Sequence, residues 1–531
     1  MNTAVTNPIR LPRWWSVCAA IVLAGTTAAI TKATATAAEV PADAQARSTW
    51  LAIDDETFPL KRGLCYYLSK PVARREPVLG PSRDNPNAPD YMAAHFYGTV
   101  LFDQGKFRMW YYAVNAGKDL SDLKQGPVCY AESQDGIQWI KPNLGQVEFH
   151  GSRSNNAIRL PDQTTQSAAV IVDPQDPDPK RRYKMVYNAS NGQTWVFRTG
   201  TSPEGTTWTF APDYAINQFL EMSSFYRHQG LYIVNGQSSG DGEGGVARGR
   251  QGYAFVSADF VHWLPEVADA FILTEPSEPS ARGFQKPYDQ VHLGVGAASF
   301  GNIAVGLYGR WHNFAGDKTR NIPNSWFGFG QISCDFGLVI SNDGLRFREP
   351  VKDHIYLSRT NSPVTPLEGK PYPTILCQSG NGILNVGDET RIYHGRWRNS
   401  EYGLDYWGEI ALATLPRDRW GSLGLPPDNT NGWVWTKPIT LPTEGWRMRL
   451  NATQADAIHV EIADPQFRLL PECSDAQAGR CKAATGLVSP VEWLGSNATK
   501  LAGKTVRFRF HLAGSSQVRP QLFAVYMEPG L

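Results

Sequence analysis

Short apolar segments separated by turn residues recur along the chain from residue 95 to residue 413. In the first block, residues 95–102 and 107–112 flank the turn Asp103–Gly105, and residues 128–132 form a third apolar segment. Short apolar runs bounded by turns in this order predict a β-meander. The same order of segments returns in four further blocks, which cover residues 168–197, 221–256, 291–340 and 382–413.

Four of the five blocks close on a shared heptad, in which a Ser leads two residues later to an acidic residue and an aromatic ends the motif. The copies span residues 133–139, 202–208, 257–263 and 341–347. Ser and Asp side chains cap local backbone, Gly relieves strain and the closing aromatic packs between neighbouring blocks. We therefore interpret the heptad as a turn device and exclude its acidic residues from catalysis: Asp135, Glu204, Asp259 and Asp343.

The repeat predicts an all-β fold. Strand-like sequence between widely spaced heptads fits propeller blades better than helical solenoid repeats, so we expect a five-bladed β-propeller over residues 89–420, preceded by an N-terminal extension at 39–88. Residues 421–432 are rich in Pro, Gly and Asn and predict a linker. Residues 433–531 alternate apolar and polar positions, which predicts a C-terminal β-sandwich.

Residues 1–38 predict a secretory signal peptide. Arg10 and Arg13 precede an apolar run from Val17 to Ile30, and small residues up to position 38 offer cleavage sites. The run is shorter than the roughly 20 residues of a spanning helix, although an uncleaved anchor stays open as an alternative. We expect a secreted or periplasmic protein with no membrane contact apart from this signal.

Six cysteines remain after the signal. Cys473 and Cys481 flank a polar loop, and an exported chain favours a disulfide between them. The other four are too scattered to pair from sequence: Cys65, Cys129, Cys334 and Cys377. None has the spacing of a zinc site. We expect no cofactor, with a structural Ca²⁺ held through oxygen ligands as an open alternative.

The charge balance argues against nucleic acid as a partner. The chain has 51 basic and 50 acidic residues and a net charge of +1, so no strong field would attract a polyanion or an acidic membrane. Aromatic residues make up 11% of the chain and include 17 Trp. Most of these rings belong to the core, but such rings also stack on sugars, and a carbohydrate is the partner that we expect. The oligomeric state is left open.

Candidate catalytic residues are the polar residues where inner strands begin, because inner strands converge on the central channel of a propeller. Glycoside hydrolysis needs carboxylates that act as acid and as base or nucleophile. Asp289 is the strongest candidate, since it precedes His292 at the start of an apolar segment. Glu221 and Asp90 hold comparable positions in other blocks, and the nearby His95 and His292 are candidate substrate-binding residues. Weaker candidates are Asp162, Glu401 and Asp405.

Two Arg-Trp pairs supply candidate substrate-binding groups. Arg310 and Trp311 follow the second strand of the fourth block, and Arg396 and Trp397 hold the same place in the fifth. Planar guanidinium and indole groups can clamp and stack on a saccharide. Packing between blades is the alternative role for both Trp residues.

The chain resembles bacterial secreted proteins related to glycoside hydrolase families 32 and 43 over roughly residues 60–530. The resemblance is carried by the heptads and by the segments Gly380–Glu389, Tyr393–Trp397 and Ile410–Leu415. It implies five-bladed propellers that act on fructosides, arabinosides or xylosides, with acidic residues from separate inner strands. By position, the resemblance implies three roles: Asp90 as base or nucleophile, Glu221 as stabiliser and Asp289 as acid.

The family 32 signature Trp-Met-Asn-Asp-Pro-Asn and the Arg-Asp-Pro and Glu-Cys elements are absent from residues 89–420, so fructosidase activity does not carry over. Our leading hypothesis is an exported glycoside hydrolase that acts on a plant- or algal-type oligo- or polysaccharide. One alternative is a glycoside phosphorylase, with Arg310, Arg396 and Arg398 around the phosphate. Another is a carbohydrate-binding propeller without catalysis.

Overall fold

The protein is built from strands joined by turns, as the sequence pattern predicts. The computed structural model describes residues 48–115, 126–162, 165–241, 247–273, 291–312, 333–366, 369, 373–378, 380–398, 406–482, 485–494 and 498–530. Helical structure in these ranges is limited to short 3-10 turns: η3 (Pro179–Arg181), η6 (Ala455–Ala457), η7 (Pro471–Cys473), η8 (Asp475–Gln477) and η9 (Ala498–Leu501). None of the described helices could cross a membrane. The expected signal peptide lies outside these ranges.

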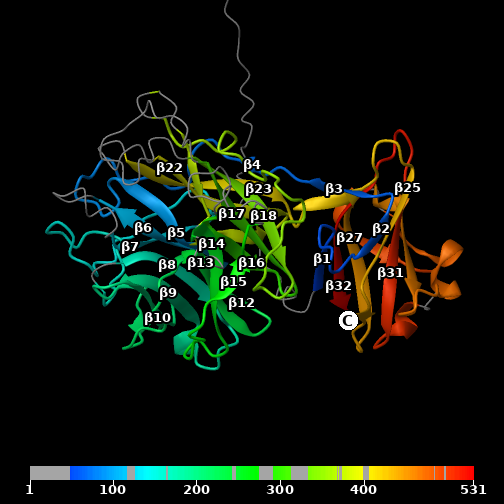
Figure 1. Cartoon of the computed structure of the whole chain (residues 1–531), viewed down its shortest axis with the longest axis horizontal. Coiled ribbons are helices and arrows are strands. Elements are labelled where there is room, and N and C mark those ends of the chain that lie inside the picture. The colour runs from blue at the N-terminus through cyan, green and yellow to red at the C-terminus, as the bar shows by residue number, and fades with distance from the viewer. Residues whose placement is uncertain are drawn as a thin grey trace, which may run out of the picture. The chain divides into compact units, whose positions relative to one another are not determined.

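Between residues 93 and 416 the described strands form five successive antiparallel groups, called units below. The second and third units are four-stranded sheets, whereas the first, fourth and fifth are joined in one 12-stranded sheet through β19 (Ile375–Cys377) and the parallel pairing of β23 with β5. Most of these strands are labelled in Figure 1. The first two contain β5 (Ala93–Asp103), β6 (Lys106–Val114) and β7 (Val128–Ser133), then β8 (Thr165–Val172), β9 (Tyr183–Ser190), β10 (Trp195–Ser202) and β11 (Thr209–Phe210). The third contains β12 (Glu221–His228), β13 (Leu231–Asp241), β14 (Ala247–Ser257) and β15 (Ala268–Phe271). The last two contain β16 (Val291–Ser299), β17 (Ala304–His312) and β18 (Ser333–Ser341), then β21 (Ile383–Val386), β22 (Glu389–Arg398) and β23 (Trp407–Pro416).

The first strands of the units meet around a short segment, β20 (Gly380–Asn381). It pairs in parallel with β5, so that Asn381 lies opposite Thr99. The Asn381 amide donates to the carbonyl of Val170 on β8 at 3.1 Å and to that of Phe225 on β12 at 2.5 Å, and accepts from the Phe225 N–H at 3.0 Å. A single side chain thus satisfies three backbone groups of two units, while its own backbone pairs with β5 of a third.

Each heptad forms the turn predicted for it. In the first copy, Ser133 Oγ accepts the N–H of Gly136 at 2.9 Å, and Asp135 Oδ1 accepts the N–H groups of Ile137 and Gln138, both at 2.8 Å. Burial alone would raise the pKa of Asp135, but these backbone hydrogen bonds hold it below its usual value. The carboxylates of the heptads accept local backbone N–H groups, as a turn device would; their exclusion from catalysis stays a prediction.

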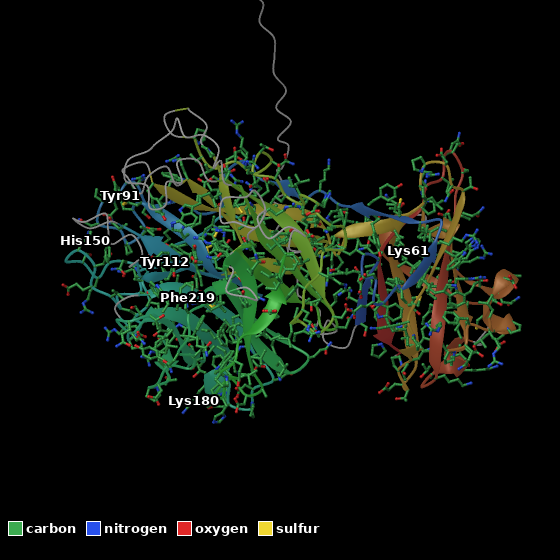
Figure 2. All side chains as sticks on the ribbon, in the orientation of Figure 1. Lys61, Tyr91, Tyr112, His150, Lys180 and Phe219 are labelled. Carbon is green, nitrogen blue, oxygen red and sulfur yellow. The ribbon has the colours of Figure 1, made fainter. Side chains whose placement is uncertain are left out.

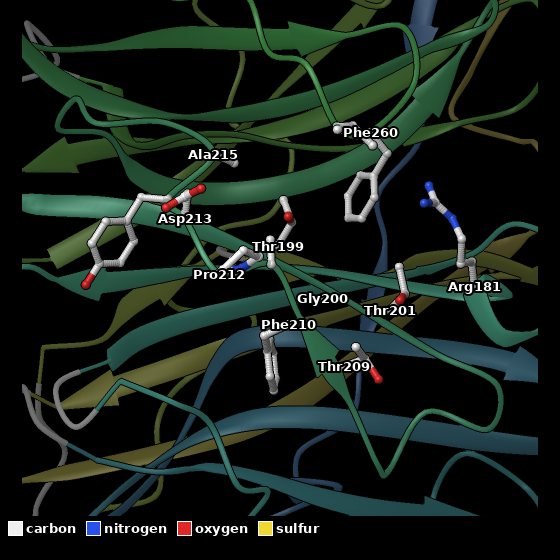
Figure 3. Close-up of a pocket in the computed structure, with 13 residues that line it drawn as sticks. Arg181, Thr199, Gly200, Thr201, Thr209, Phe210, Pro212, Asp213, Ala215 and Phe260 are labelled. Atoms are coloured by element: carbon white, nitrogen blue, oxygen red, sulfur yellow. The ribbon is translucent and has the colours of Figure 1, made fainter.

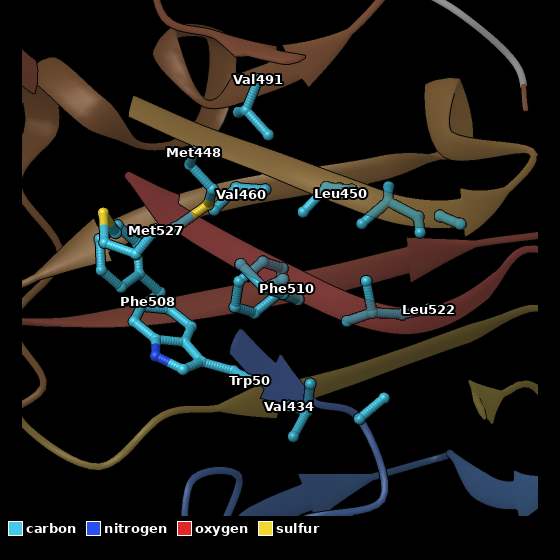
Figure 4. Close-up of a cluster of buried hydrophobic side chains, with 14 of the residues drawn as sticks. Trp50, Val434, Met448, Leu450, Val460, Val491, Phe508, Phe510, Leu522 and Met527 are labelled. Carbon is cyan, nitrogen blue, oxygen red and sulfur yellow. The ribbon is translucent and has the colours of Figure 1, made fainter. Parts of the chain in front are cut away.

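The C-terminal residues form one continuous sheet system together with the N-terminal strands. Its C-terminal members are β24 (Gly421–Gly424), β25 (Asn431–Trp435), β26 (Ile439–Thr440), β27 (Trp446–Thr453), β28 (Ile458–Ala463), β29 (Gly479–Cys481), β30 (Thr485–Glu492), β31 (Thr505–Ala513) and β32 (Gln521–Pro529). Its core includes Val434, Val460, Phe508 and Phe510, which face one another in Figure 4. Part of the predicted linker is therefore strand β24, whose residues are all buried.

Residues from the predicted N-terminal extension pair with this C-terminal sheet. The strands β1 (Ser48–Leu51), β2 (Leu60–Arg62) and β3 (Cys65–Leu68) pair with β32, β25 and β24 respectively. A fourth strand, β4 (Val72–Ala73), pairs instead with β23 of the fifth unit. Residues 48–68 and residues 421–529 therefore share one sheet, and the five units lie between these two segments in sequence.

The predicted disulfide between Cys473 and Cys481 is wrong, since both are free thiols. Both side chains are buried within the C-terminal hydrophobic core, where burial raises the pKa of Cys473 to about 11 and that of Cys481 to about 12. They serve as small apolar residues, a common use of buried cysteine. The other four cysteines are free thiols as well: Cys65, Cys129, Cys334 and Cys377.

Candidate functional site

Glu221 lies at the start of β12, where donors from three other strands converge on its carboxylate. Tyr97 on β5 donates its hydroxyl to Oε1 at 3.2 Å, and Gln166 on β8 donates its amide to the same oxygen at 3.3 Å. Gln237 on β13 donates to Oε2 at 2.5 Å. Glu221 and Gln166 are half-buried, whereas Tyr97 and Gln237 are buried. This is where the structure brings a predicted catalytic carboxylate into a convergent polar network.

Register shifts in the inner strands place these side chains. The pairing of β5 with β6 skips between His95 and Thr99, which leaves Tyr97 inside the irregular stretch. The pairing of β8 with β9 skips in the same way around Gln166. A bulge turns a side chain out of the regular alternation of a strand. The first strands of the third and fourth units also have register shifts, between Met222 and Ser224 on β12 and between His292 and Val295 on β16. All four strands therefore bend next to the site.

Aromatic rings form a wall beside Tyr97. His95 packs edge-on against Trp397, with ring centroids 4.8 Å apart, and its Nε2 lies 2.6 Å from the hydroxyl of Tyr406. Tyr97 contacts His95 and Trp397 at centroid distances of 6.0 and 6.2 Å. Tyr112 on β6, labelled in Figure 2, stacks on His95 at 6.2 Å. Two residues predicted to bind substrate, His95 and Trp397, therefore contact each other and reach Glu221 through Tyr97.

His292 lies next to the same network from the fourth unit. Gln237, which donates to Glu221, accepts the N–H of Leu293 through its Oε1 at 2.6 Å. Leu293 has a φ of 60°, a left-handed backbone conformation that is uncommon for a residue with a branched side chain. The amide of Gln378 donates to the carbonyls of His292 and Gly294 at 2.5 and 2.9 Å. Two glutamines thus hold a strained turn beside the carboxylate.

Both histidines of the site are neutral over the ordinary pH range. Burial lowers the pKa of His95 to about 3. Burial also places the pKa of His292 well below its usual value, and the positive charge of Arg250 lowers it further. Neutral imidazoles can donate or accept a hydrogen bond but add no charge.

Of the other two predicted catalytic carboxylates, Asp90 does not join this network, and the position of Asp289 is not described. Asp90 is 1% exposed, and its Oδ2 accepts from Lys141 Nζ at 2.6 Å and from the Tyr111 hydroxyl at 2.9 Å. This ion pair anchors the segment before β5. Asp289 lies outside the described residues, as do Glu401 and Asp405. Asp162 is held by Arg198 at 2.7 Å and by Tyr187.

The arginines predicted to bind substrate have structural partners. Arg396 is buried and donates to Ser362 Oγ at 2.9 Å and to the Arg75 carbonyl at 2.6 Å, while the carboxylate of Glu409 lies 3.6 Å away. Arg310 is buried and lies 3.5 Å from the carboxylate of Asp353. These contacts favour a role in joining segments of the fourth and fifth units. Trp311 belongs to β17, but its side chain is not among those described.

The described residues contain no group of His, Cys, Asp and Glu side chains that could hold a metal ion. A separate surface groove of 390 Å³ lies on the second unit, as shown in Figure 3. It is lined by residues of β10 and β11 and by Phe260 and Val261 of the third heptad. Asp213 is the one carboxylate among its lining residues, so the groove does not offer the pair that glycoside hydrolysis needs.

The sequence missed the residues that surround Glu221. Register shifts surround Tyr97 and Gln166, whereas Gln237 lies directly opposite Glu221 in the regular pairing of β12 with β13. One signal was present: Gln166 and Gln237 are amides at the polar ends of apolar runs, and a buried amide needs a partner. The partner itself could be found only from the fold.

No family model matches the chain. Two proteins of Mycobacterium tuberculosis, "Uncharacterized protein Rv1502" of strain ATCC 25618 / H37Rv and "Uncharacterized protein MT1551" of strain CDC 1551 / Oshkosh, are each 26% identical to it over 157 residues. The matched region is 28% of this chain and 47% of each relative. The chain therefore spans about half the length of the curated relatives it matches.

The solved structures similar to this chain include glycoside hydrolases and phosphorylases. One comes from work on the "GH130 family of mannoside phosphorylases", with a TM-score of 0.42 and 15% identity over 65% of this chain and 94% of that chain. Another is a glycoside hydrolase family 43 arabinoxylan arabinofuranohydrolase from Bacillus subtilis, with a TM-score of 0.37 and 10% identity over 85% and 98%. At such low TM-scores the function has to be argued from the site.

Proposed function

We propose that the protein is a carbohydrate-active enzyme that cleaves glycosidic bonds, with Glu221 as the central carboxylate. The observation that carries this proposal is the convergence of Tyr97, Gln166 and Gln237 on its two oxygens. Every one of these groups donates to Glu221, so the carboxylate is oriented as an acceptor. It therefore suits the role of base, nucleophile or stabiliser of a positively charged transition state better than that of proton donor.

The proposed scaffold is a five-bladed β-propeller, with the five units as blades, followed by a β-sandwich. The first strand of each unit and β20 would form its inner wall. The three-way hydrogen bonding of Asn381 supports this arrangement, because it requires β8, β12 and β20 to meet at one place. Glu221 would then lie at one mouth of the central channel, where the register shifts of four inner strands occur.

The substrate that suits this mouth is a neutral sugar of a plant- or algal-type oligo- or polysaccharide. Trp397 is half-buried beside His95 and Tyr97, and aromatic rings offer apolar faces with polar edges. We propose Asp289 as the proton donor, because it lies two residues before β16 and three before His292. The role of Asp90 as base or nucleophile stays a prediction from the resemblance, because the Asp90 carboxylate is already paired with Lys141.

A glycoside phosphorylase is the second candidate. The observation that favours it is Arg250, whose positive charge acts on His292 at the edge of the proposed mouth. A guanidinium there could bind inorganic phosphate as the attacking group, in place of water. We further propose export of the protein through the signal peptide at residues 1–38, so that it would meet its polysaccharide in the periplasm or outside the cell.

The test is to assay the purified protein on a panel of aryl glycosides and polysaccharides, with and without inorganic phosphate. Glu221→Gln keeps the side-chain size but removes the charge, and we expect it to lower kcat/KM by about 10²- to 10⁴-fold. Glu266→Gln, at an exposed position, is the matched control and should leave activity unchanged.

Free sugar without added phosphate would identify a hydrolase, and sugar 1-phosphate a phosphorylase. If the protein binds sugar but releases none under either condition, the non-catalytic alternative replaces the proposal. Full activity of Glu221→Gln would exclude the proposed site.

A further inference from the structure

A row of basic and aromatic side chains crosses five neighbouring strands of the C-terminal sheet. The strand order there is β2, β25, β31, β28 and β29. Pairing places Arg62 opposite Trp433, Trp433 opposite His511, His511 opposite His459 and His459 opposite Arg480. We call these five residues the cross-strand row. Strands in a sheet lie about 4.8 Å apart, so the row is roughly 19 Å long.

The cross-strand row faces away from the core. Residues 505–513 of β31 alternate strictly, with apolar residues buried and the residues between them at least partly exposed. In Figure 4, Val434, Val460 and Phe510 point into the core. Successive side chains in a strand point to opposite faces, so their neighbours Trp433, His459 and His511 lie on the outer face. Arg62 and Arg480 at the two ends of the row are exposed.

The outer face has an excess of positive charge. Two acidic side chains near the row are paired: Glu461 lies 2.5 Å from Arg509, and Glu492, which lies opposite Arg480 in the pairing of β29 with β30, lies 2.7 Å from Lys482. The guanidinium of Arg480 lies 2.5 Å from His459 Nε2. Burial lowers the pKa of His459, and the positive charges of Arg480 and His511 lower it further. The middle of the row thus lies in a positive field.

Aromatic rings beside the cross-strand row are backed by guanidinium groups. Arg509 lies 5.4 Å from the ring centroid of Trp435, and Arg507 lies 4.1 Å from that of Phe467. Phe467 is 41% exposed and Trp433 in the row is half-buried, whereas Trp435 is buried. A face that combines exposed rings with cationic groups offers contacts for both the sugar rings and the carboxylates of an acidic saccharide.

We propose that the cross-strand row binds an acidic saccharide chain, such as a polyuronate, and so holds a polysaccharide near the protein. The match of charge is the main argument: the chain as a whole is nearly neutral, whereas this face combines Arg62 and Arg480 with two histidines. The inference rests on the proposed function, that the protein cleaves glycosidic bonds. It adds that the polysaccharide containing the cleaved bond is acidic.

The experiment measures binding of the full chain to polygalacturonate and to its fully methyl-esterified form, which has the same sugar backbone without the charge. We expect retention by the acidic polymer in affinity electrophoresis and weaker retention by the ester. Arg62→Gln combined with Arg480→Gln should raise the Kd for polygalacturonate about tenfold, since exposed ion pairs each contribute up to about 1 kcal/mol.

Arg153→Gln, which removes an exposed charge from the first two units, is the matched control and should bind like the natural chain. Equal binding of both polymers, an unaltered Kd for the double variant, or equally tight binding to double-stranded DNA would each overturn the inference. Glu221→Gln separates it from the proposed function: polymer binding should persist in that variant while cleavage is lost. Cleavage without polymer binding would overturn the inference alone.

Discussion

Gln237 is the residue that links Glu221 to the strained turn of the fourth unit. Its amide nitrogen donates to the carboxylate, while its oxygen accepts the N–H of Leu293. Both groups are buried or half-buried, and an unpaired polar group in such a place is costly. Since Leu293 holds a left-handed conformation that its side chain disfavours, the glutamine offsets local strain and orients the carboxylate at the same time. We regard Gln237 as a positioning residue for Glu221.

Gln237→Leu should therefore affect both stability and activity. Loss of the acceptor for Leu293 should lower the free energy of unfolding by about 1–3 kcal/mol. If Glu221 acts as proposed, loss of the donor to its carboxylate should lower kcat by about 10- to 100-fold, with a smaller change in KM.

Gln378→Leu is the comparison variant, because Gln378 holds the same turn without contacting Glu221 in any described hydrogen bond. Urea unfolding and steady-state kinetics on both variants check the prediction. An equal loss of kcat in both would show that Gln237 acts only through the fold.

At the scale of elements, the heptad turns set the ends of the units. Glycine occupies the left-handed position in three copies, with φ of 73° at Gly136, 87° at Gly205 and 74° at Gly344. In the third copy Phe260 takes this position with a φ of 67°, and its ring is buried in the core of the third unit. The packing of that ring offsets the backbone strain, which explains why the sequence can depart from glycine there.

Gly205→Ala should destabilise the protein more than Gly192→Ala, although both glycines have a φ of 87°. A methyl group at 205 would lie 2.9 Å from Trp110 and 3.3 Å from Tyr183, whereas nothing lies within 4 Å at 192. The left-handed backbone costs both variants about 1–2 kcal/mol, and crowding should cost Gly205→Ala about 1–3 kcal/mol more. Denaturant midpoints with a common m-value check this difference, and equal losses would contradict the packing described for the second heptad.

At the scale of the whole molecule, buried neutral histidines couple folding to pH. Burial lowers the pKa of His95 and of His394 to about 3, and places that of His292 well below the usual 6.5. The unfolded chain therefore binds more protons than the folded one at any pH between about 3 and 6.5. Their contribution to stability is complete above pH 6.5 and is lost progressively as the pH falls toward 3.

We expect the free energy of unfolding to fall between pH 6.5 and pH 4.5, by about 1.4 kcal/mol per pH unit for each of the three histidines. Carboxylates with lowered pKa values, such as Asp162 and Asp173, lose their contribution only below their unfolded values near 4, so this window isolates the histidines. Urea titrations at several pH values measure the slope. His95→Gln should reduce the slope by the contribution of one histidine, whereas His150→Asn, at an exposed position, should leave the slope unchanged. A free energy of unfolding that does not change with pH in the natural chain would contradict the burial of all three histidines.

The repeat could be predicted from the sequence because the units share a local pattern. Short strands alternate with turns, and the Ser, Asp and Gly of the heptad form a turn within seven residues. The candidate site was only partly readable. Glu221 stood out as a charge in an apolar stretch, and His95 and Trp397 were expected near it. Arg310 and Arg396 held similar sequence positions, yet the structure pairs Arg396 with the buried Glu409 and places Arg310 near the exposed Asp353. Sequence position along a strand does not reveal which face a side chain takes after a register shift.

Sequence alone therefore determined the all-β character, the repeated units and the structural use of the heptad acids, because those features depend on contacts between residues close in the chain. Only the tertiary structure decided which polar groups surround Glu221, that Cys473 and Cys481 are core thiols, and that residues 48–68 complete the C-terminal sheet. These depend on bulges and on pairing between residues as far apart as Ser48 and Met527. No local pattern encodes such pairings.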